Sequence, residues 1–510
     1  MLKNTHSGRS IVLSAATLGL LTLPVFSGPI FSGSALANDA MSAELAALVE
    51  RQSEMLARQA QQLEAMQARL GQLESRESLD EDAFAQPVQR QASASVPATS
   101  EDQAAIVELQ SQVALLEAAQ TDQSRINWSG GGPEFISADG SRRLEIGGRL
   151  QFDTSTTSGS DFDDRNIRGS TARRLQLDLA GQLSERVGYK LGYDLANNSV
   201  SMRDAYISSL FNWWGKDAEV YVGNKYDDRT LDGATSSNNT WFMERNFVNA
   251  AVAPDRGSYG LGVKGKVFGN NRDWHTSFAV TNGRLGGNTD RNDTTTYMTR
   301  AHWNPWHDGT DMVHLGAWGF YEDFDSSSGN VTNNINAADG FNDNVTIRAR
   351  AVSDPESSRA YGLELATSLG SFAAAAEYGQ RTVDQDEGSG GQSLSYDAWA
   401  VQASYFLTGE QHGYSRKSGL WRLPNINNPV SSGGMGAFQL AARYQELDFY
   451  DEPHYLGGDG DSTTLGLNWY PNDWARVMLN YTLWNTNNRS VSFRGPDDGN
   501  TLSARLQLVF

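Results

Sequence analysis

The chain has 510 residues, no cysteine, and 61 acidic against 41 basic residues, which gives a net charge of −20. The acidic balance argues against nucleic-acid binding, because a phosphate backbone requires a positive protein surface. The lack of cysteine excludes disulfides, thiolate zinc sites, iron–sulfur clusters and cysteine nucleophiles. Hydrophobic residues make up only 39% of the chain, while aromatic residues reach 10% and glycines number 50. This mixture is typical of a transmembrane β-barrel, in which apolar residues take alternate positions and aromatic residues lie at the membrane interfaces.

Residues 1–37 have the features of a secretory signal peptide. Lys3 lies in a positive N-terminal region, an apolar run follows at 11–26, and a small-x-small motif occupies 35–37. The apolar run is short for a membrane span, so we expect cleavage after this motif rather than retention as an anchor. No later segment approaches 18 consecutive apolar residues, and the sequence therefore predicts an exported chain without a transmembrane helix.

The next segment, 38–127, is almost free of glycine and rich in Ala, Gln, Glu and Leu. Over 38–79 a seven-residue repeat predicts a coiled coil, with one seam position occupied by Val49, Leu56, Leu63 and Leu70. Residues 80–100 contain two prolines and are predicted to be a linker, and 101–127 form a second short helical or coiled-coil segment. A single amphipathic helix on a surface is the alternative. The narrow apolar seam favours self-association and hence an oligomer.

From Trp128 the hydrophobic period changes from helical to two, so that Leu144 and Ile146 alternate with polar neighbours. The alternation predicts strands in an all-β, 16-stranded antiparallel transmembrane barrel over 128–510. We expect these strands near residues 144–153, 174–179, 187–195, 202–211, 218–222, 259–267, 274–280, 297–303, 313–321, 361–369, 372–378, 399–407, 438–444, 465–469, 477–483 and 502–510.

The connections between these strands are of two kinds. Some have only a few residues, whereas 226–256 and 323–359 are long and polar. Short periplasmic turns and long external loops are typical of outer-membrane barrels. The last strand places Leu506, Leu508 and Phe510 on one face, as such barrels commonly do. A soluble β-sandwich or propeller is the alternative, but it accounts less well for the signal peptide and for Trp and Tyr at strand ends.

An ordered series of short motifs resembles the phosphate-selective porin O and P family. These motifs are LEIGGRLQFD at 144–153, ARRLQL at 172–177, GQL at 181–183, YKLGYD at 189–194, DAYI at 204–207, VGNK at 222–225 and FMERN at 242–246. The resemblance implies a 16-stranded homotrimeric porin with a constriction loop folded inside and basic residues that guide anions. In this chain 226–256 holds three arginines and five acidic residues. We therefore expect weak anion selectivity, with phosphate or other oxyanions as solutes, rather than a high-affinity filter.

Strand parity independently assigns side chains to the lumen. If aliphatic positions face lipid, the basic residues of the lumen are Arg149, Arg174, Lys190, Lys225, Lys264, Lys266, Arg300, Arg443, Arg476 and Arg505. The acidic ones are Glu145, Asp153, Asp178, Asp194, Glu219, Glu364 and Glu377. Because selectivity follows local rings of charge, this small positive excess favours anions despite the negative net charge.

The residues predicted to line the pore and guide anions are Arg149, Arg174, Lys190, Lys225, Arg229, Arg245, Lys264 and Lys266. For each of them, pairing with a carboxylate on a neighbouring strand is the alternative. Arg173 has the wrong parity for the lumen, and we expect it at a rim or in a β-bulge. Residues 226–256 are predicted to form the constriction loop, with 323–359 as the alternative, because long loops without their own structure are usually functional.

The sequence offers little support for an enzyme or a metal site. His302 and His314 flank Asn304-Pro305-Trp306, which is interpreted as an interfacial turn rather than part of a metal site. No nucleophile-elbow sequence is present. We therefore predict no catalytic residue, metal or cofactor, and a homotrimeric porin of the bacterial outer membrane. Its expected partners are membrane lipid, lipopolysaccharide and small anions such as phosphate. The alternatives are an envelope tether with a plugged barrel and, from a different class, an outer-membrane hydrolase.

Overall fold

The computed structural model describes residues 124–128, 132–283, 285, 294–325, 329–338, 340–451, 455–489 and 492–510. All of them belong to the second of two compact units, which begins at Ala104. The predicted signal peptide, coiled coil and linker lie outside the described residues, as does the second helical segment apart from its last four positions. Within the described ranges, no helix has the length and hydrophobicity needed to cross a bilayer.

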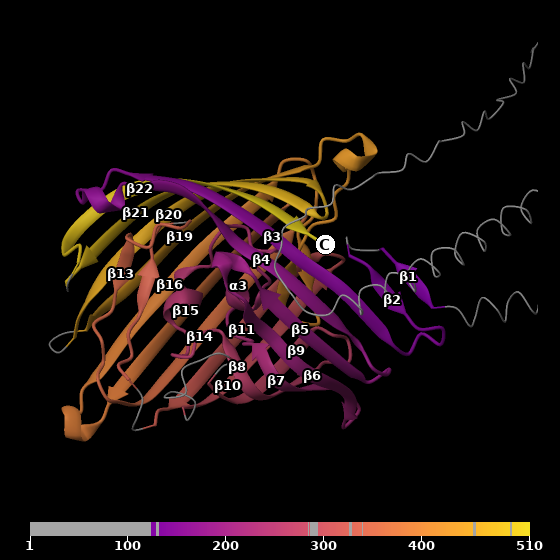
Figure 1. Ribbon diagram of the computed structural model, residues 1–510, viewed down its shortest axis with the longest axis horizontal. Coiled ribbons are helices and arrows are strands. Elements are labelled where there is room, and N and C mark those ends of the chain that lie inside the picture. The colour runs from indigo at the N-terminus through magenta and orange to yellow at the C-terminus, as the bar shows by residue number, and fades with distance from the viewer. Residues whose placement is uncertain are drawn as a thin grey trace, which may run out of the picture. The chain divides into compact units, whose positions relative to one another are not determined.

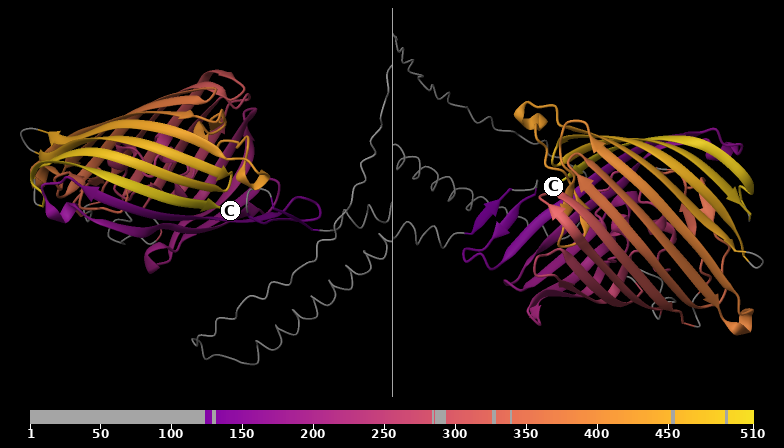
Figure 2. Two further views of the ribbon diagram at one scale, coloured as in Figure 1. Left: turned by 90° about the horizontal axis from the view of Figure 1, so that it is seen from above. Right: turned by 180° about the vertical axis from the view of Figure 1, so that it is seen from behind.

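Sixteen strands form a closed antiparallel barrel, drawn in Figures 1 and 2. The first eight are β3 (Arg143–Ser158), β4 (Arg168–Gln182), β5 (Val187–Asp194), β6 (Ser201–Trp213), β7 (Lys216–Tyr226), β8 (Tyr259–Phe268), β9 (Trp274–Asn282) and β10 (Thr295–Asp308). The others are β11 (Asp311–Asp323), β14 (Pro355–Leu369), β15 (Phe372–Gln385), β16 (Ser393–Phe406), β19 (Ala437–Asp451), β20 (Tyr455–Asn472), β21 (Ala475–Asn488) and β22 (Gly495–Val509).

Each barrel strand pairs with the next, and β22 pairs with β3 from Asn500↔Ser158 to Val509↔Arg149. The last strand thus closes the sheet onto the first, and the predicted 16-stranded barrel is confirmed. Closure leaves the ring without a free edge. Two further short strands, β1 (Arg125–Asn127) and β2 (Glu134–Ile136), pair with each other, and β2 pairs with the start of β3.

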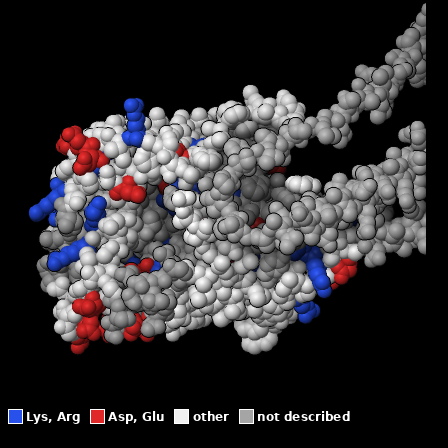
Figure 3. Space-filling view, viewed as in Figure 1, with Lys and Arg blue, Asp and Glu red and all other residues white. Residues whose placement is uncertain are grey.

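Along the strands, burial alternates with the predicted period of two. On β14, for example, Tyr361, Leu363 and Leu365 are more than half exposed, whereas Glu364 and Ala366 are buried. The exposed apolar positions form the outer surface. In Figure 3 basic and acidic side chains gather toward the two ends of the barrel, as expected for a wall that crosses a lipid bilayer.

The two ends of the barrel differ in their connections. At one end, the turn side, the links are short: 183–186, 214–215, 269–273, 309–310, 370–371 and 473–474. The opposite end, the loop side, carries the two longest loops, 227–258 and 324–354. The turn side has one exception, because the link 407–436 is as long as those loops. This end therefore does not consist of short turns alone.

Smaller elements lie in these connections. They are α3 (Leu231–Ala234), α4 (Phe247–Ala251), β12 (Asn334–Asn336), β13 (Thr346–Arg348), β17 (Gly413–Ser415) and β18 (Leu420–Arg422), and the 3-10 turns η1 (Asp163–Arg165), η2 (Ala196–Asn198), η4 (Glu387–Ser389) and η5 (Val430–Ser432). The predicted turn at 304–306 is also corrected: β10 continues to Asp308, and the register shifts between Trp303 and Trp306. A bulge accommodates Pro305, which cannot donate to the ladder.

Candidate functional site

The first inward segment is 227–258, which folds inside the barrel. Side-chain oxygens cap its two short helices, since Thr230 accepts from Gly233 N at 2.7 Å and Asn246 accepts from Asn249 N at 3.0 Å. Strands β15 and β19 hold these helices, and β21 and β22 hold the chain between them. The bonds are Leu231 N to Glu377 Oε1 (2.6 Å), Phe247 N to Gln445 Oε1 (3.0 Å), Arg476 Nη1 to Thr240 O (2.7 Å) and Arg505 Nη1 to Met243 O (2.6 Å).

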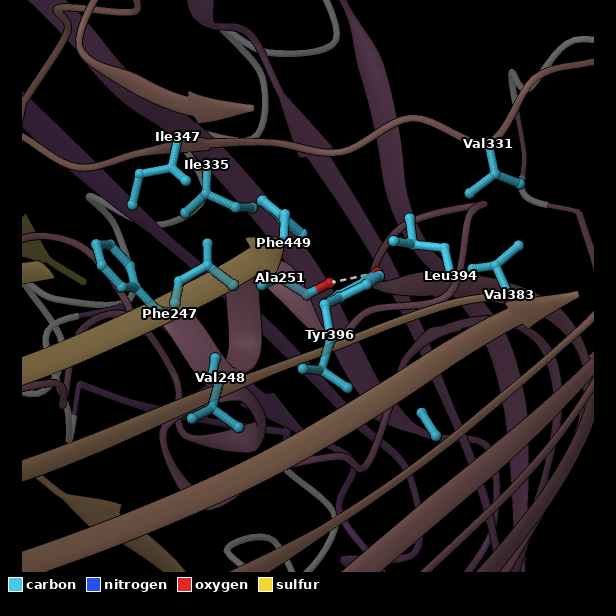
Figure 4. Packing of buried hydrophobic residues seen from close by; sticks show 14 of the residues in the cluster. Phe247, Val248, Ala251, Val331, Ile335, Ile347, Val383, Leu394, Tyr396 and Phe449 are labelled. Carbon is cyan, nitrogen blue, oxygen red and sulfur yellow. Dashed lines mark hydrogen bonds between the residues drawn. The ribbon is translucent and has the colours of Figure 1, made fainter. Parts of the chain in front are cut away.

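The second inward segment, the described residues of 324–354 (all but 326–328 and 339), packs on the first. Asn333 Nδ2 donates to Ala251 O at 2.6 Å, and Tyr396 of β16 donates to the same carbonyl at 3.3 Å. Figure 4 shows the apolar contact between the two segments and the wall, where Phe247 and Val248 lie near Ile335, Ile347 and Phe449. Both long loops that the sequence offered as constriction candidates therefore lie inside the barrel.

The third inward segment belongs to the link 407–436 and enters from the turn side with β17 and β18, whereas 427–435 of this link are mostly exposed. The ring of Trp421 lies 4.9 Å from that of Trp241, and Asn239 Nδ2 donates to Trp421 O at 3.1 Å. Lys417 Nζ forms an ion pair with Glu219 of β7 at 2.6 Å. Together the three inward segments cover much of the inner face of β9–β22.

Two cavities lie along the inner face of β3–β7, and the space that they form is called here the open path. The loop-side cavity, of about 790 Å³, is lined by residues of β4 and of the first two inward segments, among them Arg174 and Arg245. The turn-side cavity, of about 410 Å³, lies over β3–β7 and is lined by residues that include Lys190, Tyr206 and Glu219.

Four arginines are named here the arginine cluster: Arg149 of β3, Arg174 of β4, Arg203 of β6 and Arg245 of the first inward segment. Arg174 and Arg245 line the loop-side cavity. Arg149 interacts electrostatically with Arg203, Arg245 and Asp178, and Arg174 with Arg245. Asp178 pairs with Lys190 of the turn-side cavity at 3.4 Å. The cluster is therefore part of the loop-side cavity and interacts electrostatically, through Asp178, with the turn-side cavity.

Within the described part of the chain, the arginine cluster forms hydrogen bonds to neutral acceptors and no ion pair. The acceptors are Ser237 Oγ for Arg149 (2.7 Å), Gln151 Oε1 for Arg174 (2.9 Å), Tyr259 OH for Arg203 (2.5 Å) and the carbonyls of Asp232 (3.2 Å) and Thr235 (2.8 Å) for Arg245. A guanidinium has five N–H donors, and these bonds use one or two of them. The remaining donors suit the paired hydrogen bonds that oxyanions accept.

Lys225 lies on the same wall, beside the turn-side cavity. Its ammonium group lies 5.2 Å from the ring centroid of Tyr206 and 4.8 Å from that of Tyr221. Two cation–π contacts hold this charge without neutralising it.

Four other predicted anion-guiding residues have structural partners. Lys264 pairs with Asp227 and Lys266 with Asp228, each at 2.8 Å. Lys190 pairs with Asp178 at 3.4 Å and with Asp204 at 3.6 Å. The buried Arg229 donates to Asn249 O at 2.9 Å and to Val252 O at 2.5 Å within its own segment.

Parity misassigned Arg173, and the sequence analysis did not consider Arg203; both lie at irregular places in the sheet. Between β3 and β4 the register shifts at Gln151/Phe152, which leaves Arg173 as the extra residue of a bulge. The bulge turns Arg173 into the lumen, where it pairs with Glu244 at 2.9 Å. The prediction of a bulge was right, but the prediction that Arg173 does not face the lumen was wrong. Arg203, which the sequence analysis missed, lies beside a register shift between β5 and β6.

Glu244 of the first inward segment lines the loop-side cavity together with Arg174 and Arg245. Besides Arg173 it contacts Arg505, at 3.1 Å. Desolvation raises the pKa of Glu244, but the two guanidinium groups lower it further, so that the pKa lies well below its ordinary value. Glu244 therefore stays ionised, paired with Arg173 and Arg505.

Comparison with known proteins finds a match between residues 144–510 and the model of the family described as phosphate-selective porin O and P. An uncharacterised protein of Caulobacter vibrioides is 29% identical over 76% of this chain and 77% of its own. Porin O of Pseudomonas aeruginosa is 26% identical over 74% of this chain and 91% of its own. Among solved structures, OmpT of Vibrio cholerae aligns with a TM-score of 0.45 at 10% identity, covering 72% of this chain and 98% of that one. An anion-selective porin from Comamonas acidovorans aligns at 0.44 and 12% identity, covering 72% and 100%.

Proposed function

The chain belongs to the phosphate-selective porin O and P family of outer-membrane porins, and from that premise we propose that it is a trimeric, weakly anion-selective channel. Small hydrophilic solutes, phosphate and other oxyanions among them, would diffuse through it passively. The observation that carries this proposal is the arginine cluster, four guanidinium groups beside the open path with neutral acceptors.

Local charge decides selectivity because screening limits each charge to about one Debye length, roughly 8 Å at physiological salt. The arginine cluster and Lys225 favour anions along the open wall. Asp178 and Asp204 lie on the same wall, and Lys190 offsets both of them only in part, at 3.4 and 3.6 Å. This opposition supports a weak preference and shallow phosphate binding.

The trimer rests on two supports. The family resemblance implies three associated barrels, and the heptad seam with Val49, Leu56, Leu63 and Leu70 can bundle three helices. Mass measurement in mild detergent tests it: we expect a trimer, and a monomer would contradict the proposal.

Reversal potentials in planar bilayers test the selectivity. With a KCl gradient we expect chloride to be favoured over potassium, and added phosphate to reduce the chloride current at millimolar concentration. A preference for potassium would show that the carboxylates dominate and would overturn the proposal. The alternative of a plugged envelope tether predicts no conductance at all.

A further inference from the structure

The loop-side cavity has two chemically different walls. One is cationic, with Arg173, Arg174 and Arg245 beside Glu244. The other comes from the first two inward segments, where the partly exposed Ala250 and Phe341 lie among the asparagines Asn249, Asn333, Asn334 and Asn336, and Phe247, Ile335 and Ala338 are buried behind them. A site for inorganic phosphate needs the first wall and has no use for the second. A cavity of about 790 Å³ is also in the range that holds organic ligands, roughly 300–1,000 Å³.

The cationic wall keeps a positive excess. Arg173 and Arg505 pair with Glu244, at 2.9 and 3.1 Å, and Arg505 also pairs with Asp153, at 2.7 Å. Arg174 and Arg245, by contrast, form no ion pair within the described residues. Asp343 also lines the cavity, but it is exposed to solvent, where screening weakens its effect. Two guanidinium groups are thus available to a bound anion.

The second wall includes an aromatic ring at the loop end of the cavity. The half-buried Phe341 packs on Gly169 at the start of β4, where a Cβ atom would lie 2.8 Å from the ring. Only glycine lets the ring approach the strand this closely. Arg173 and Arg174 follow Gly169 along β4, about 13–17 Å deeper at roughly 3.3 Å per residue. The ring therefore lies toward the mouth and the guanidinium groups toward the floor.

We propose that the loop-side cavity binds organic anions that carry a carboxylate at one end and an apolar ring at the other. The carboxylate contacts Arg174 and Arg245, and the ring lies against Phe341. The proposal rests on the anion-preferring channel proposed above and names its solute class. Such a molecule spans the distance between the two walls, whereas phosphate leaves the second wall exposed to water.

Two probes with the same carboxylate and different bodies test this: propionate and 3-phenylpropionate. The measurement is the concentration of each that halves the chloride current of the full-length protein in planar bilayers. Because burying a phenyl ring is strongly favourable, we expect 3-phenylpropionate to act at roughly tenfold lower concentration or less. Equal half-blocking concentrations would overturn the organic-anion site.

Variants of Phe341 test whether the difference between the two probes arises at this side chain. Phe341→Ser should bring the two half-blocking concentrations together, and the matched control Phe341→Leu, which keeps an apolar side chain, should retain most of the difference. Both variants should keep the chloride conductance measured without probe, which reports folding. A ratio unchanged in Phe341→Ser would contradict the proposal even if the wild type discriminates.

The same recordings separate this proposal from the proposed function. A channel that prefers chloride over potassium but responds equally to both probes contradicts the organic-anion site alone. A channel that prefers potassium contradicts the anion-selective function and the solute class with it.

Discussion

The inner faces of β3–β8 and of β9–β22 follow the same alternation and carry the same kinds of basic residue, yet they use them differently. On β3–β8, Arg149, Arg174 and Arg203 bond to neutral acceptors beside the open path. On β21 and β22, Arg476 and Arg505 are buried and donate to carbonyls of the first inward segment. We therefore propose that a lumen-facing arginine without an ion pair contributes to selectivity where the wall is open, whereas a lumen-facing arginine stabilises the fold where the wall is covered.

Uncovering the inner face of β9–β22 should give the largest effect, and this effect should be on conductance. Shortening the first inward segment between Thr230 and Asn246 removes the cover of β15 and β19–β22, so we expect the single-channel conductance to rise about twofold or more. An equally large deletion in the predicted linker at 80–100 is the control and should leave conductance unchanged. If shortening has no effect, the second or the third inward segment sets the pore size.

Neutralising arginines on the inner faces of β3–β8 and of β9–β22 should distinguish the arginines that set selectivity from those that stabilise the fold. The double variant Arg174→Gln and Arg245→Gln removes two charges from the open path, and the reversal potential should move toward potassium. Arg476→Gln removes a charge of the same kind from the covered wall, where it is fully buried. We expect this matched control to leave the reversal potential close to wild type. Equal shifts in both variants would contradict the distinction between the walls.

The stability of the barrel, unlike its selectivity, should depend most on buried charged residues. The Arg505–Asp153 pair joins the closing strands β22 and β3 at 2.7 Å, with both side chains fully buried. Asp153→Ala leaves that guanidinium short of a partner, at a cost of about 3–5 kcal/mol, and should lower the temperature at which the barrel unfolds on heated gels. The exposed pair Arg359–Asp384 is the control, because Arg359→Gln should cost about 1 kcal/mol or less. Similar losses of stability in both variants would contradict a larger contribution from the buried pair between β22 and β3.

The sequence predicted the strands well because burial against lipid imposes a strict period of two. It failed where the period breaks: Arg173 and Arg203 lie at register shifts, which parity counting cannot include. Which wall is covered depends on contacts between distant segments, such as Trp421 with Trp241, which no local pattern encodes. The length of 407–436 was nevertheless a readable signal, since links this long usually have a function.

The smallest expected effect is on the pH dependence of anion preference. It concerns Glu244 of the first inward segment, which contacts Arg173 near the open path and Arg505 on the covered wall. These two guanidinium groups lower the pKa of Glu244 despite its desolvation. A lowered carboxylate pKa means that the charge persists on acidification and is lost only below the ordinary carboxylate range of about 4. Glu244→Gln should therefore increase anion preference at pH 7, because it frees Arg173 while Arg505 keeps its pair with Asp153, and the difference from wild type should persist at pH 4. Exposed loop carboxylates titrate near that pH in both proteins, so their contribution cancels in the comparison. If the reversal potentials of wild type and Glu244→Gln converge at pH 4, Glu244 loses its charge in the ordinary carboxylate range. The two arginines then stabilise that charge less than their geometry implies.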